Sequence, residues 1–172
     1  MSQAIEDCIA HEQWEAARRL IEEALTDMPE SHWLLTRLGL TYYEQFDYRK
    51  ALEIAEKALA IAPDCPLVLW DYAGSLEMLD RPQEAIAVYQ KLIERGVEAL
   101  AYDECGEGRA WARGLYADCF YRMSHCCLAL GRKAEALDVL SRHLNQRGPG
   151  CRSIYPIRKV RAEMAALKSV PT

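Results

Sequence analysis

The sequence has few of the features that mark membrane, disulfide-bonded or metal-binding proteins. No run approaches the roughly 20 apolar residues that cross a bilayer, and residues 1–7 lack the basic start and apolar run of a signal peptide. The seven cysteines follow no repeated spacing and include no C-x-x-C pair, which favours reduced thiols over a disulfide framework or a zinc site. We therefore expect a cytoplasmic protein that uses no membrane, metal or cofactor.

Arrangements that would carry catalysis are equally scarce. The four histidines are scattered, and none stands in a recognisable order with a thiol and a third, orienting group. Cys119 and Cys126 lie two helical turns apart beside His125, a spacing that places both thiols on one helix face, either as zinc ligands or, as we interpret them, as small buried apolar residues. Gly106 and Gly108 form a G-x-G that lacks the lysine, the threonine and the preceding strand of a phosphate loop. We expect no enzymatic activity.

Charge is unevenly distributed along the chain, although the net charge is only −5. Residues 1–108 hold 22 Asp and Glu against nine Lys and Arg, whereas residues 109–172 hold four acidic against twelve basic residues. The basic end is either an ordinary solvated surface or a patch for an acidic partner or a second copy's acidic body. Nucleic acid is not expected as a partner, because the net charge is negative and few aromatic residues separate the basic ones. The predicted basic patch contains Arg152, Arg158, Lys159 and Arg161.

What the sequence does contain is a regular period of small and apolar residues. Between residues 31 and 63 the period is defined by Leu38, Gly39, Tyr42, Ala51, Ala58 and Pro63. One period earlier stand Ala17, Ala24 and Pro29, and one period later stand Tyr72, Ala73 and Ala85. After residue 99 the register shifts by half a period, because Gly131 and Ala136 match the turn and the alanine only if a repeat begins near Ala117. Such a period indicates stacked pairs of antiparallel helices.

These residues resemble the tetratricopeptide repeat family, whose unit of about 34 residues carries the pattern W-x2-L-G-x2-Y, A-x3-F and a closing proline. The resemblance covers most of the chain. It implies an all-α, right-handed α-solenoid of about four helix-turn-helix hairpins plus a C-terminal capping helix. We expect a single domain, 1–172, with repeats at about 1–31, 32–65, 66–99 and 117–150, an insertion at 100–116 and the capping helix at 154–168.

The insertion has its own expected structure. Gly106 and Gly108 are predicted to break the chain, after which residues 107–130 run as one long helix of about six turns. The part of this helix that exceeds the ordinary repeat either covers the preceding hairpin or serves in docking or dimerisation.

The resemblance also implies where a partner binds. In the family, the first helix of each hairpin lines a concave groove, and reading the groove positions in this chain predicts a largely aromatic and apolar surface. The alternative is that Trp33, Trp70 and Met78 are ordinary core or are covered by the protein's own insertion. The expected contact residues are Trp33, Leu40, Tyr43, Trp70, Gly74, Met78, Tyr121 and His125.

We therefore interpret the chain as a non-enzymatic protein-protein interaction scaffold, either an adaptor or a secretion-type chaperone, that binds an apolar helix or an extended peptide of a partner protein. The alternative is a structural protein that forms a homo-oligomer through contacts between its acidic body and its basic C-terminal end. Family members that clamp a terminal carboxylate carry asparagines with lysine or arginine in the groove. The sole asparagine, Asn145, is expected on a second helix, which argues against recognition of that kind.

Overall fold

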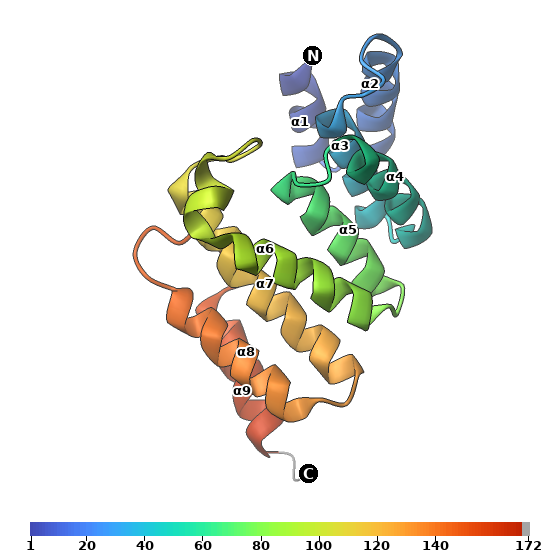
Figure 1. Cartoon of the computed structure of the whole chain (residues 1–172). Helices are drawn as coiled ribbons and strands as arrows, with labels where there is room; N and C mark the ends of the chain where they lie inside the picture. The colour runs from blue at the N-terminus through green and yellow to red at the C-terminus, as the bar shows by residue number, and fades with distance from the viewer. Residues whose placement is uncertain (170–172) are drawn as a thin grey trace. The chain divides into compact units, whose positions relative to one another are not determined.

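The computed structural model describes residues 1–169, and every regular element over these residues is an α-helix (Figure 1). Contacts between helices divide the chain into two compact units, unit 1 over residues 1–79 and unit 2 from residue 80 onward. Unit 1 holds α1 (Ser2–Ala10), α2 (Trp14–Asp27), α3 (His32–Glu44), α4 (Tyr48–Ile61) and α5 (Pro66–Met78). Unit 2 holds α6 (Pro82–Tyr102), α7 (Arg109–Ala129), α8 (Lys133–Gln146) and α9 (Ile157–Ser169). The all-α fold expected from the sequence is confirmed.

A residue with a left-handed backbone follows the first helix of each successive repeat. Its φ is 56° at Glu12, 65° at Phe46 and 57° at Asp80, three positions that follow one another at intervals of one full repeat. The next such turn is at Gly131, where φ is 71°. Gly131 comes half a repeat later than the period alone would place it, which confirms the register shift read from the sequence. The backbone therefore keeps the period even where the turn residue is not glycine.

Buried alanines hold the helices of unit 1 close together. Ala17 of α2 and Ala51 and Ala58 of α4 are all buried, and a methyl group at such positions lets neighbouring helices approach closely. Two helices also begin at capping residues, because the side chains of Ser31 and Asp47 accept hydrogen bonds from backbone N–H groups in the first turns of α3 and α4. The caps thus fix where α3 and α4 begin, and the buried alanines allow the helices of unit 1 to pack closely.

Unit 2 is built around the long helix α7. Helix α6 bends at Gly96, whose φ of 73° and ψ of 165° are not helical, and then continues to Tyr102. After the loop of residues 103–108, Gly108 with a φ of 87° precedes α7, which runs for 21 residues. The single long helix expected over residues 107–130 is confirmed. The segment 100–116, which the sequence indicated as an insertion, holds the end of α6, this loop and the first two turns of α7.

Helix α9 covers the end of unit 2. It begins at Ile157, close to the capping helix expected at 154–168, and packs against α8. Tyr121 of α7, Leu140 of α8 and Val160 of α9 form a buried core. Among the described residues, no helix is both long and apolar enough to span a membrane.

Candidate functional site

Six of the eight predicted contact residues lie on α3 and α5 of unit 1, two helices that pack against each other. We call this surface the α3/α5 face. Most of its side chains are half-buried, whereas Gly74 is buried and Met78 is 43% exposed. The α3/α5 face is defined by Trp33, Leu40 and Tyr43 from α3 and by Trp70, Gly74 and Met78 from α5.

Arg37 of α3 contacts both a carboxylate and an aromatic ring beside this face. The Arg37 Nε donates to Oε1 of Glu6 on α1 at 2.6 Å. Its guanidinium carbon lies 5.4 Å from the centroid of the Trp33 ring, a distance at which the cation and the ring attract each other. The Arg37 side chain is only 19% exposed, so water screens these two contacts less than it would at an open surface. Arg37 therefore holds Trp33 in place.

Asp71 of α5 adds an unusual carboxyl group to the same region. Burial raises the pKa of Asp71 from 3.8 to about 7, and the positive charge of Arg37 partly opposes this shift. At neutral pH the group is therefore divided between its acid and carboxylate forms. It can donate a hydrogen bond to a partner or accept one from it.

The selection of groove residues from the sequence missed these charged side chains, because it followed apolar positions. Arg37 and Asp71 are one full repeat apart and so occupy the same repeat position. Two successive repeats carry a charged residue at this same position, close to Trp33 and Trp70. That recurrence is a sequence pattern that indicates Arg37 and Asp71. Glu6 carries no such signal, because its pairing with Arg37 depends on where α1 lies.

Tyr121 and His125 of α7 lie in unit 2, in different surroundings. Tyr121 is fully buried, its hydroxyl donates to Oε1 of Glu163 on α9 at 2.9 Å, and its ring stacks on that of Tyr155. His125 is half-buried, with Nε2 3.9 Å from Oε2 of Glu163. Tyr121 is therefore a core residue of unit 2. It is covered by α8, by α9 and by Tyr155 between them.

Residues 148–156, which form most of the connection between α8 and α9, lie along α7, and we call them the strap. The Arg152 N–H donates to the carbonyl oxygen of Ala110 at 3.2 Å. Two residues later, the Ile154 N–H donates to Oδ2 of Asp118 at 3.0 Å. These two contacts fix the strap to α7 at points two helical turns apart.

The residues of the predicted basic patch lie on the strap and on α9. Arg152, Arg158, Lys159 and Arg161 are all exposed. Lys159 Nζ lies 4.0 Å from Oε1 of Glu163, which is a weak pair at an exposed site. The patch thus stands at the surface of unit 2, where charged partners have access to it.

Several ionisable groups in unit 2 are kept neutral by burial. Burial lowers the pKa of His143, whose Nδ1 lies 2.8 Å from the carbonyl oxygen of Ala117. It raises the pKa of the Cys119 thiol well above its usual value, and that of Cys127 as well. Because the thiolate is the reactive form of cysteine, these two thiols are poor nucleophiles and poor metal ligands.

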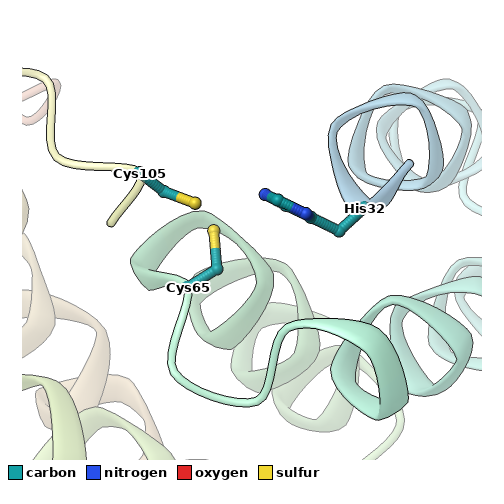
Figure 2. Close-up of side chains that lie close together, drawn as sticks. All are labelled: His32, Cys65 and Cys105. Atoms are coloured by element: carbon teal, nitrogen blue, oxygen red, sulfur yellow. The ribbon is translucent and has the colours of Figure 1, made fainter. Parts of the chain in front are cut away.

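His32 and Cys65 bring an imidazole and a thiol together in unit 1. His32 is the first residue of α3, and Cys65 immediately precedes α5. Their side chains point toward each other in Figure 2, with a ring nitrogen and Sγ within 4.8 Å. Figure 2 also labels Cys105, which belongs to unit 2. A structural zinc site takes four ligands of this kind, of which unit 1 contributes His32 and Cys65.

An apolar cleft of about 320 Å³ opens on unit 2 where α7, α8 and α9 meet. His125 and Glu163 stand in its wall, and the other lining residues are mainly apolar. Its apolar lining residues are Leu128, Leu140, Ala166 and Leu167.

Comparisons with known proteins agree with this architecture. Residues 42–104 match the family described as tetratricopeptide repeat. A crystal structure of MamA is 18% identical, covers 83% of this chain and 74% of its own, and superposes with a TM-score of 0.64. MamA from Desulfovibrio magneticus RS-1, from residue 41 to its end, is 15% identical, with 85% and 73% covered and a TM-score of 0.65. A thermophilic TPR protein of Thermus thermophilus is 17% identical, with 98% and 97% covered and a TM-score of 0.50.

No curated protein matches the sequence significantly. At the identities of these solved structures, the likeness is one of fold. The family predicted from the sequence is confirmed: residues 42–104 belong to the tetratricopeptide repeat family, within an all-helical fold of the same type.

Proposed function

We propose that the protein is a non-enzymatic protein-protein interaction scaffold, an adaptor or a secretion-type chaperone of the cytoplasm, whose α3/α5 face binds an apolar helix or an extended peptide of a partner. The observation that carries the proposal is the presence of three half-buried aromatic side chains, Trp33, Tyr43 and Trp70, on two packed helices. The tetratricopeptide repeat fold supports it, since helical repeat proteins bind partners on extended surfaces. The absence of a disulfide among the seven cysteines agrees with a reducing compartment.

Half-buried aromatic side chains are favourable anchors for a partner. Full burial of a large apolar side chain contributes about 1.5–3 kcal/mol, and Trp, Tyr and Arg predominate among residues that carry binding energy. Arg37 already holds Trp33, so that ring loses little conformational freedom when a partner binds. Asp71 and Glu6 would favour a partner with an N–H donor or a basic side chain near its apolar residues.

A photo-crosslinker placed on the face tests this proposal. Benzoylphenylalanine would replace Met78 in the full chain, and exposed Glu56 on α4 would serve as the matched control position. A partner that crosslinks from position 78 and not from position 56 would be identified by mass spectrometry. Equal crosslinking from both positions would contradict binding at the α3/α5 face.

The captured segment would then be titrated, as a purified peptide, against the wild type, Trp70→Ala and Tyr43→Ala. We expect both variants to melt close to the wild type and to bind at least about tenfold more weakly, which corresponds to about 1.4 kcal/mol. If both variants unfold, the two residues belong to the core. Unchanged affinity in both variants would also make the proposal wrong.

Self-assembly is a second candidate function, which the charge distribution favours. Unit 1 carries 15 acidic and six basic residues, whereas the rest of the chain carries 11 acidic and 15 basic residues. The exposed basic patch would attract the acidic unit of a second copy, over a range of about 10 Å at 0.1 M salt. Light scattering over a concentration series tests this. Growth at low salt that disappears at moderate salt supports self-assembly, and a constant monomer mass at low salt excludes it.

A further inference from the structure

The strap, residues 148–156, contacts α7 largely through its own main chain. The Arg152 N–H donates to the Ala110 carbonyl oxygen at 3.2 Å, and the Ile154 N–H donates to Asp118 Oδ2 at 3.0 Å. Proteins hold extended peptides with contacts of this kind, because almost any residue supplies them. The strap therefore lies on α7 as a peptide ligand lies on a binding face.

The aromatic side chain of Tyr155 anchors the strap. The Tyr155 ring stacks on Tyr121, with 4.0 Å between ring centroids, and Arg122 Nη1 donates to the Tyr155 hydroxyl at 3.4 Å. In contrast, Ile154 is 69% exposed and Arg152 is exposed too. Because the strap buries little apolar surface beyond this ring, little hydrophobic free energy opposes its release.

At Gly114, which has no side chain, the backbone of the strap comes close to α7. A Cβ atom on Gly114 would lie 2.3 Å from the carbonyl oxygen of Arg152, well inside van der Waals contact. A Cβ atom on Gly39 of α3 would instead lie 3.6 Å from Cγ2 of Ile54, an ordinary distance. Glycine is a poorer helix former than alanine, so its presence in the first half of α7 is explained by the close approach of the strap.

The Asp118 carboxyl group lies on the surface of α7 beneath the strap, and the strap forms a hydrogen bond with only one of its two oxygens. Oδ2 accepts the Ile154 N–H, whereas Oδ1 is buried and has no hydrogen-bond partner within residues 1–169. Burial raises the pKa of the carboxyl to about 6, although hydrogen bonds from Ser153 and Ile154 and the charge of Arg147 oppose the shift. The ionised carboxylate is therefore less favourable beneath the strap than in water, and opening the strap restores its hydration.

We infer that the surface of α7 formed by Gly114, Asp118 and Tyr121 is a second binding site, for an extended peptide, and that the strap closes it as an internal ligand. The peptide that fits this site passes its backbone over Gly114, presents an N–H to Asp118 and carries an aromatic ring on the next residue for Tyr121. Ile154 and Tyr155 of the strap supply that N–H and that ring. The site lies in unit 2 and does not depend on the α3/α5 face.

The test uses the full chain and a fluorescein-labelled peptide of residues 148–157. In the strap variant Ile154→Pro/Tyr155→Ala, the strap loses the Ile154 N–H and the Tyr155 ring, two of its contacts with α7, whereas α7 is unchanged. We expect this variant to bind the labelled peptide about tenfold more tightly than the wild type does, because the wild-type site is available only while the strap is open. Adding Gly114→Ala should abolish binding, since the Cβ takes the space of the peptide backbone. Adding Gly39→Ala should leave it unchanged.

Equal affinity of the strap variant and the wild type would overturn the proposal, and so would binding that survives Gly114→Ala. Hydrogen exchange of the wild type provides a measurement that needs no variant. The amides of Arg152 and Ile154 should exchange much earlier than those at the centre of α7, around Tyr121. If they exchange only together with the centre of α7, the strap opens only on unfolding and the proposal is wrong.

Discussion

The ring of Tyr155 stacks on the ring of Tyr121, with 4.0 Å between the centroids and 30° between the planes. Tyr121 belongs to the middle of α7, and Tyr155 belongs to the strap. The Tyr121 hydroxyl also donates to Glu163, so α9 and the strap cover it together. A side chain whose repeat position assigns it to an open groove is thus part of the core in unit 2. In unit 1 the aromatic side chains of the α3/α5 face remain half-buried.

Gly114→Ala is expected to detach the strap while leaving α7 helical. The added Cβ would lie 2.3 Å from the carbonyl oxygen of Arg152, and a backbone cannot move aside as a flexible side chain does. We expect a loss of about 1–3 kcal/mol of stability, as overpacking usually causes, and faster tryptic cleavage after Arg152. Gly39→Ala is the matched control, expected within about 1 kcal/mol of the wild type. Unchanged cleavage in Gly114→Ala would mean that the strap does not lie against this residue.

Asp118→Asn is expected to stabilise the protein at pH 8 and to change its stability little at pH 4. In the folded state the pKa of Asp118 is raised from 3.8 to about 6, so the protonated group favours folding. That contribution is fully present below the unfolded pKa and is lost as the pH rises through 6. The difference is on the order of 1–3 kcal/mol, at about 1.36 kcal/mol per pKa unit.

Urea denaturation of the wild type and Asp118→Asn at pH 4 and pH 8 measures this difference. The comparison at each pH cancels the titration of all other groups, including that of His143, whose lowered pKa acts in the opposite direction. Asp138→Asn on an exposed position of α8 is the control and should show no such trend. A variant that loses stability equally at both pH values would contradict the prediction.

The seven thiols are expected to react in two groups with a small aromatic disulfide reagent. None of the seven cysteines forms a disulfide in the structure. Three of them are half-buried, whereas four are buried, and burial slows a thiol both by blocking access and by raising its pKa. The fast group is Cys8, Cys105 and Cys151, and the slow group is Cys65, Cys119, Cys126 and Cys127. Identification of the labelled peptides by mass spectrometry checks the order, which early labelling of Cys119 would refute.

Reversal of Arg158, Lys159 and Arg161 to glutamate is expected to leave the fold nearly unchanged and to weaken contacts with acidic surfaces. All three side chains are exposed, and single exposed charges contribute at most about 1 kcal/mol each. Thermal melting and light scattering at low salt measure the two effects separately. As a control, reversal of three basic residues on α4 changes the net charge equally without touching the patch; these are Arg49, Lys50 and Lys57. Unfolding of the triple variant on α9 would assign its residues a structural role instead.

Repeat positions alone select the six residues of the α3/α5 face, but not the charged residues beside them. Trp33 and Trp70 are selected by their positions in the repeat, and they lie on α3 and α5, which pack together as the stacking of successive repeats requires. Arg37 and Asp71 were missed, although their spacing of one full repeat carried the same information. A search restricted to apolar residues overlooks charged groups that the fold withdraws from water.

The sequence by itself determined the helices, the turns and the register, because each depends on residues close together in the chain. The left-handed turn residues Glu12, Phe46 and Asp80 follow the period, and Gly131 follows its shift. Only the tertiary structure decided which groove residues remain accessible. The pairing of Arg37 with Glu6 and the covering of Tyr121 by the strap arise where distant segments meet. Such contacts depend on the path of the whole chain, and no local pattern encodes them.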